Sequence, residues 1–179
     1  VTFSAGAVDV SGSASQYRAH QARNDEVIGG IEAFSLHNDK LTIEGRAIAN
    51  DEDYRLSLSY KPTPNTVVRA GIENYGRYDN DRGGYYPGIN PQSSYDLDEE
   101  LHYQIGRLWI QAGLQGEDVP TILLGYEYTH RRGDRSTLEW NRAGTIPVSI
   151  YPASADDDER IHVLSLDIET DINEIHIQD

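Results

Sequence analysis

The chain has 179 residues, enough for one substantial domain, and its formal net charge is −15. This acidity argues against nucleic acid as a partner, because binding a phosphate backbone requires clustered Lys and Arg. The chain contains no cysteine, which excludes disulfides, thiolate metal sites and covalently attached c-type haem.

The first residues, VTFSAGAVDV, have neither the basic start nor the continuous apolar core of a signal peptide. We expect them to form the first strand of a processed chain or of a fragment. No apolar run approaches the ~20 residues that a membrane helix needs. The mean hydropathy of −0.61 fits a soluble protein, and it also fits a β-barrel, whose strands are half polar.

Apolar and polar residues alternate along most of the chain, which is the period of a β-strand. In the hairpin of residues 53–76, one face carries Tyr54, Leu56, Leu58 and Tyr60, followed by Val68, Ala70 and Ile72. Similar runs occupy residues 1–10, 26–37, 40–49, 100–114, 120–130, 160–169 and 173–179. No segment has a convincing helical period. The sequence therefore predicts an all-β fold, built as an antiparallel meander.

Strand lengths and connections favour a barrel in the outer membrane of a Gram-negative bacterium. Several runs approach the ~9–11 residues of a tilted membrane strand, whereas ~5–6 is usual in globular proteins. The long links, 11–25, 78–99 and 131–158, all fall at one end of the strands, as in outer-membrane barrels, while the link 50–53 at that end is short. We expect an up-and-down transmembrane β-barrel, with residues 1–179 as the amino-terminal part of a larger one, because a barrel in lipid has no free edge.

The face opposite the apolar residues is charged. As a hypothesis, a polar ladder lines the barrel interior and consists of Glu44, Arg46, Arg55, Arg69, Glu73, Arg77, Arg107 and Glu127. The solvated outer face of a soluble antiparallel sheet has the same pattern. The ladder alone therefore does not separate the two kinds of protein.

Two acidic stretches are candidates for other chemistry. A Ca²⁺ ion prefers several oxygen ligands, and such ligands are offered by Asp79, Asp81, Asp96 and Asp98. A solvated acidic loop is the alternative. The run ADDDER, within residues 153–160, is expected to be solvated and mobile. No nucleophile, phosphate-binding or metal-ligand motif stands out, so we expect no enzyme.

The stretches LTIEGRAIANDEDYRLSLSYKP, VVRAGIENYGRYDNDRGGYYP and PTILLGYEYTHRRGDRSTLEW resemble the MtrB/PioB type of outer-membrane β-barrels, over residues 40–140. Members of this family are porin sheaths of conduits that pass electrons across the outer membrane. The resemblance implies a periplasmic multihaem cytochrome as partner, with the haem belonging to that partner. Some members carry a Cys-x-x-Cys pair near the amino terminus, and this chain does not.

Three functions remain open at this stage. The first is a sheath around such a cytochrome, embedded in outer-membrane lipid. The second is a diffusion porin without a haem partner. The third is a soluble all-β binding or adhesion module, whose apolar stripes would then form a core.

Overall fold

The computed structural model describes residues 1–23, 26–80, 100–116, 119–140, 150–172 and 175–178. The elements form a single sheet of nine strands and one helix. Their bounds are β1 Thr2–Ala7, α1 Ala14–Gln21, β2 Val27–His37, β3 Leu41–Ala49, β4 Asp53–Thr63, β5 Thr66–Asp79, β6 Leu101–Gly116, β7 Val119–Trp140, β8 Ile150–Ile172 and β9 Ile175–Gln178.

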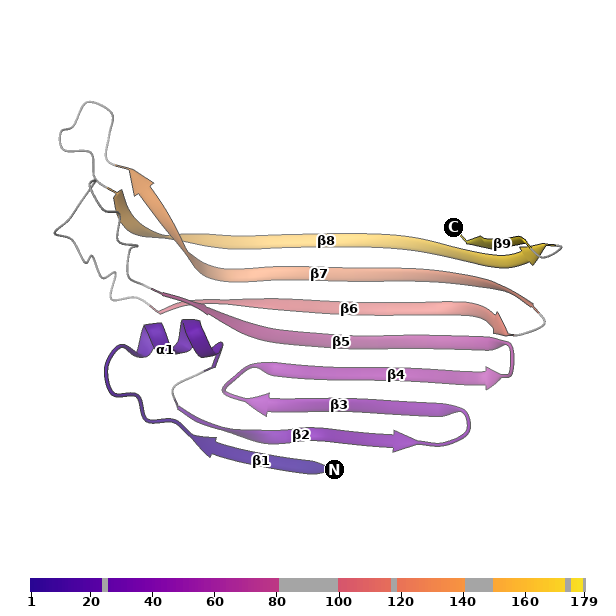
Figure 1. Cartoon of the computed structure of the whole chain (residues 1–179), viewed down its shortest axis with the longest axis horizontal. Coiled ribbons are helices and arrows are strands. Elements are labelled where there is room, and N and C mark those ends of the chain that lie inside the picture. The colour runs from indigo at the N-terminus through magenta and orange to yellow at the C-terminus, as the bar shows by residue number, and fades with distance from the viewer. Residues whose placement is uncertain (24–25, 81–99, 117–118, 141–149, 173–174, 179) are drawn as a thin grey trace.

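The strands lie in the sheet in the order in which they follow along the chain. Each described pair is antiparallel, so the chain runs up and down across the sheet from β1 to β9 (Figure 1). The predicted all-β antiparallel meander is therefore confirmed. Over the described part of the chain the sheet is open, with β1 and β9 at its two edges. None of the helices described there is long and apolar enough to cross a membrane.

The two ends of the strands differ in their connections. At one end the chain makes tight turns, as between β2 and β3, where Asn38 Oδ1 accepts from the backbone N–H groups of Lys40 and Leu41 at 2.9 and 2.8 Å. The opposite end carries α1, the β3–β4 turn and the links that follow β5 and β7 (Figure 1). We call this opposite end the long-link end.

The expectation that no segment is helical is wrong for α1, which lies within the link 11–25 and contacts β5. Ser13 is the N-cap, and its Oγ accepts from the Gln16 N–H at 3.3 Å. Ala22 ends the helix in the left-handed conformation, with φ of 51°. The helix has only eight residues, and the capping hydrogen bond and this C-terminal conformation define its two ends.

The expected long link 131–158 is also wrong, because β7 continues to Trp140 and β8 begins at Ile150. The acidic run of residues 153–160 consequently belongs to a strand rather than to a mobile loop. Its backbone pairs with β7 throughout, from Thr137↔Ala153 to His130↔Arg160. Asp157 gains further support from the Arg135 Nε atom, which lies 2.9 Å from its carboxylate.

The two faces of the sheet are unequally crowded. Val67, Leu101 and Leu123 are buried, although no second layer of structure covers them in the described part of the chain. All three lie on the face that also carries the arginines of β5 and β6, whereas large apolar residues on the other face are widely exposed. We infer that the sheet curves toward the arginine-bearing face at these residues, because side chains converge on the concave side of a curved sheet. We call this face the concave face and the other the convex face.

Candidate functional site

Apolar side chains form a continuous band on the convex face. Register places them in rows, such as Leu56↔Ile72↔Leu108↔Tyr128 and Leu58↔Ala70↔Ile110↔Tyr126. The apolar band comprises Leu41, Ile43, Tyr54, Leu56, Leu58, Tyr60, Val68, Ala70, Ile72, Leu108, Ile110, Ala112, Leu114, Ile122, Leu124, Tyr126, Tyr128, Leu164, Leu166 and Ile168. Soluble monomers rarely expose a contiguous apolar patch of more than a few hundred Å². An exposed band across six strands therefore marks a surface that contacts something apolar.

Aromatic and imidazole rings mark the border of the apolar band toward the long-link end. The Tyr126 hydroxyl lies 2.9 Å from His162 Nδ1, and the Tyr128 ring lies 4.9 Å from the His162 ring. Beyond them, the same face of β7 and β8 carries Arg132, Asp158 and Arg160. The surface thus changes from apolar through amphipathic rings to charged over a few residues of each strand.

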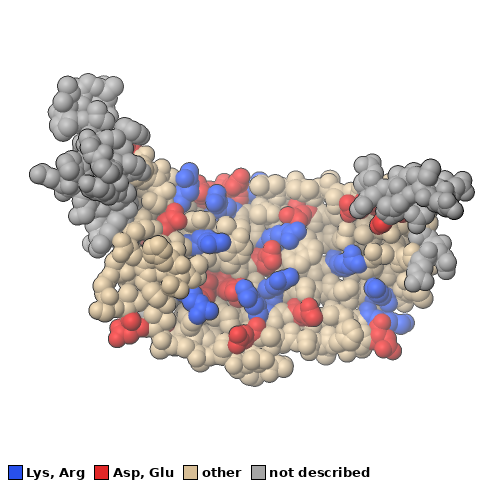
Figure 2. All heavy atoms as spheres, in the orientation of Figure 1, with Lys and Arg blue, Asp and Glu red and all other residues tan. Residues whose placement is uncertain are grey.

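The eight residues of the predicted polar ladder all lie on the concave face, which we call the charged face. Figure 2 shows basic and acidic side chains interspersed across the middle of the sheet. Their contacts divide seven of them into three groups, and Arg77 lies apart, beside the Tyr75 ring.

The first group is centred on Arg107 and spans three strands. The Arg107 Nη2 atom donates to Glu127 Oε2 at 2.6 Å, and its Nη1 atom lies 3.6 Å from Glu73 Oε1. The Arg107 guanidinium also lies 5.0 Å from the centroid of the Trp109 ring. Two carboxylates therefore hold one guanidinium, and all three groups remain partly exposed.

The second group is a hydrogen-bonded chain from β5 to β8. Arg69 donates to the amide oxygens of Gln115 and Gln111, at 2.6 and 3.3 Å. Gln111 in turn donates to Asp167 Oδ2 at 3.1 Å. Gln111 therefore reaches across β7, where its paired residue is Gly125. Arg69 thus has neutral partners, and its charge is not cancelled by them.

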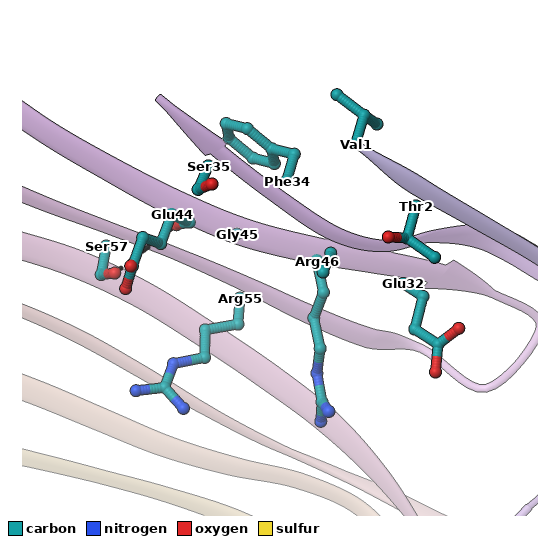
Figure 3. A pocket seen from close by; sticks show the side chains of 11 residues that line it. Val1, Thr2, Glu32, Phe34, Ser35, Glu44, Gly45, Arg46, Arg55 and Ser57 are labelled. Carbon is teal, nitrogen blue, oxygen red and sulfur yellow. Dashed lines mark hydrogen bonds between the residues drawn. The ribbon is translucent and has the colours of Figure 1, made fainter. Parts of the chain in front are cut away.

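The third group lies on β3 and β4, where Arg46 is paired directly with Arg55. Arg46 Nε donates to Asp53 Oδ1 at 3.0 Å, and a second contact joins Arg46 Nη2 to Asp53 Oδ2. Both arginines line a hollow of about 420 Å³ with Glu32 and Glu44. In Figure 3, Arg46, Arg55 and Glu32 project to the same side of the strands, and Phe34 projects to the other.

Trp109 lies flat across β5, over a glycine. A Cβ atom added at Gly71 would lie 2.1 Å from Trp109 Cζ2, so the glycine is what leaves room for the ring. Arg77 lies 5.7 Å from the Tyr75 ring, and Arg131 lies 5.0 Å from the Tyr103 ring. Arginine and aromatic side chains thus stack along the charged face, which favours fixed positions for the guanidinium groups.

A separate polar cluster surrounds Tyr78, beyond the apolar band and near the long-link end. The Tyr78 ring stacks on His102 at 4.6 Å, and Glu52 Oε2 lies 3.1 Å from His102 Nε2 and accepts from Gln104 Nε2 at 2.8 Å. Burial, together with the smaller effect of the charges of Glu52, Glu100 and Asp51, raises the pKa of Tyr78 to about 12. The phenol is held neutral, so this cluster stabilises the fold.

Of the four predicted Ca²⁺ ligands, only Asp79 belongs to the described residues; Asp81, Asp96 and Asp98 lie outside them. Asp79 Oδ2 accepts from the Ser136 N–H at 2.8 Å, which joins β5 to β7. Among the described residues, no group of three or more His, Cys, Asp or Glu could hold a metal ion. The Ca²⁺ site stays a prediction.

Sequence reasoning missed the uncharged members of the charged face. Gln111 and Gln115 connect Arg69 to β8, but the ladder was chosen by charge alone. The alternation of the sequence could have identified Gln111, because Arg107, Trp109 and Gln111 are alternate residues of one strand and so lie on the same face. The stacking of Trp109 on Gly71 depends on cross-strand register, and no local pattern reveals it.

In comparisons with known proteins, no family model, no curated protein and no solved structure matches this chain. Function is therefore argued from the two faces of the sheet.

Proposed function

We propose that this chain forms part of the wall of an outer-membrane β-barrel of porin type, in a Gram-negative bacterium. The apolar band contacts lipid, and the charged face lines the interior. The observation that carries this proposal is the exposed apolar band on the convex face, with rings along one border and charges beyond. Outer-membrane barrels have such an outward apolar band, flanked by aromatic girdles, around a polar interior.

A soluble binding module is the competing function, and the burial pattern argues against it. In a soluble sheet the apolar face packs against a second layer, and the charged face meets water. Here the burial is reversed: of the four apolar side chains that are buried in the described part of the chain, three, Val67, Leu101 and Leu123, lie on the charged face, and Leu164 on the apolar face is 79% exposed. The fourth, Tyr78, lies on the other face but beyond the apolar band.

The edges of the sheet support the same proposal. β9 pairs with β8 only from Glu169 to Ile172, so most of the long strand β8 has one edge without a described partner. Unpaired backbone groups cannot lie in lipid. In this proposal, residues 1–179 are one region of a larger barrel, and further strands complete its wall.

The interior has two candidate occupants, which are water and a protein. The resemblance of residues 40–140 to MtrB/PioB-type barrels favours a periplasmic multihaem cytochrome held inside the barrel, with electron transfer across the outer membrane as the activity. The haem in that case belongs to the cytochrome. The alternative is a water-filled porin that passes small solutes, to which the charged face is equally suited.

Extraction and spectroscopy of the full-length protein test these proposals together. We expect release from membranes only with detergent, and release into plain buffer would contradict the membrane barrel. A haem absorption band in the purified complex, with little conductance in a planar bilayer, supports the sheath. Ion conductance without haem supports the porin and contradicts the sheath.

A further inference from the structure

The charged face carries three arginines that form no ion pair with a described carboxylate. Within the described residues, the ion pairs of this face involve Arg46, Arg107, Arg131 and Arg135. Arg55, Arg69 and Arg77 have no described carboxylate in salt-bridge range: Arg69 bonds two amide oxygens and Arg77 lies beside a tyrosine ring. We call these three residues the arginine stripe.

Register places the stripe along the strand direction. Arg55 pairs with Glu73, so the three arginines occupy the β5 rows of residues 69, 73 and 77. At ~3.3 Å per residue, successive rows lie about 13 Å apart. The carboxylate of Glu73, which is paired with Arg55, interacts with Arg107 on β6. A solute that moves along β4 and β5 therefore passes a guanidinium without an ion pair at regular intervals.

Carboxylates without an arginine partner also lie on this face. Glu32 and Glu44 line the same hollow as Arg55, and Asp167 accepts from the amide of Gln111, which itself accepts from Arg69. These carboxylates lower the positive potential at Arg55 and Arg69, but they form no ion pair with them, so the stripe keeps guanidinium groups that can pair with another anion.

We propose that the arginine stripe is a contact site for small anions whose charge is carried by carboxylate or phosphate groups. Planar guanidinium groups recognise both kinds of anion through paired N–H donors. This inference rests on the proposed function, because it names the solute class that follows this wall of the interior. Arg55 forms the middle contact and lines the hollow shown in Figure 3.

Trp109 is a built-in probe for this site. Its indole covers Gly71, whose row lies between the rows of Arg69 and Arg55. Residues 1–179 contain two tryptophans, so Trp140→Phe, with any tryptophan outside these residues also replaced by Phe, leaves Trp109 as the only one. Quenching of Trp109 fluorescence by iodide reports the local anion concentration, and quenching by neutral acrylamide reports access alone.

The test compares two double variants of the full-length protein in the Trp140→Phe background, at a fixed ionic strength of about 0.1 M. Arg55→Gln/Arg69→Gln removes two charges beside Trp109. Arg132→Gln/Arg160→Gln removes two charges from the other face and is the matched control. We expect the iodide quenching constant to fall about two- to threefold in the first variant and to stay unchanged in the control. Inorganic phosphate, added at constant ionic strength, should lower iodide quenching only where the stripe is intact.

Equal iodide quenching in all variants would overturn the proposal, and so would an equal fall in both double variants. A change in acrylamide quenching in the first variant would mean that access to Trp109 has changed. In that case the single variant Arg55→Gln replaces the double variant in the comparison, because Arg55 forms no ion pair with a described residue and its replacement breaks none. These readouts do not require a bilayer. A protein that dissolves without detergent yet retains its iodide preference would contradict the membrane barrel and leave the stripe standing.

Discussion

Leu123 and Leu124 are consecutive residues on β7, yet Leu123 is 6% exposed and Leu124 is 63% exposed. Successive side chains of a strand point to opposite faces, so the two exposed fractions compare the crowding of the two faces at one place in the sheet. Leu123 lies in the row Val67↔Gly113↔Leu123 on the crowded charged face. Leu124 lies in the apolar band. Of these two leucines, the more exposed one is the one that the proposed function places against lipid.

Replacing Leu124 with Arg separates a lipid-facing from a water-facing position. We expect Leu124→Arg to lower the free energy of unfolding from vesicles by about 2–4 kcal/mol, the cost of a cation near the bilayer centre. In water, a substitution at so exposed a position usually costs less than about 0.5 kcal/mol. Urea titration in vesicles measures the change. Ser154→Arg, on the same face beyond the band, is the control, and equal small effects at both positions would contradict the assignment.

Truncating Leu123 tests the crowding of the charged face. Leu123→Ala should lower the free energy of unfolding by about 2–5 kcal/mol, because it removes buried methyl groups and leaves a cavity. Leu124→Ala should cost clearly less, since the Leu124 side chain packs against little protein. A larger loss for Leu124→Ala than for Leu123→Ala would mean that the curvature is opposite to the one described.

The position of Trp109 depends on Gly71. A Cβ at Gly71 would lie 2.1 Å from the indole, so Gly71→Ala should displace the ring and cost about 1–3 kcal/mol. Emission of Trp109 in the Trp140→Phe background should shift as the ring moves into water. Gly6→Ala is the control, because the added Cβ would lie 3.7 Å from Ile28 Cγ1, an ordinary contact. An unchanged emission spectrum in Gly71→Ala would refute the stacked arrangement.

The Tyr78 cluster predicts a stability change at high pH. The folded pKa of Tyr78 is raised to about 12, whereas a tyrosine in an unfolded chain ionises near pH ~10. The stabilisation from neutral Tyr78 is therefore complete below pH ~10 and is lost as pH rises toward the folded pKa. We expect stability to fall less steeply over this range in Tyr78→Phe than in the unaltered protein. Identical pH profiles for the two proteins would show that Tyr78 does not titrate as described.

Alternation alone was enough to predict the strands in which one face stays apolar. β3, β4 and β5 lie where the period placed them, because Leu56, Leu58, Ala70 and Ile72 recur at every second position. The same period assigned Arg55, Arg69 and Arg107 to one face. The partners of Arg69 and Arg107 could not be predicted in this way, because Gln115 and Glu127 contact these two arginines through the register between strands.

The outer parts of β7 and β8 were missed for a physical reason. Beyond His130 and His162 both faces carry charged residues, such as Arg132, Asp157 and Asp158, so the apolar period disappears although the backbone ladder continues. The helix α1 was missed because it has no apolar stripe. The sequence does mark the start of this helix, because Ser13 is followed three residues later by Gln16, which is the spacing of a capping box.

The most direct test of the lipid-facing band is fluorescence quenching from within the bilayer. The variant Leu124→Trp, in the background Trp109→Phe/Trp140→Phe with any tryptophan outside residues 1–179 also replaced by Phe, places a single tryptophan in the apolar band. Vesicles whose lipids carry bromine near the middle of the acyl chains quench only tryptophans that lie in the hydrocarbon. The account predicts strong quenching at position 124 and weak quenching for Ser154→Trp in the same background. Equal, weak quenching at both positions would show that the band does not face lipid.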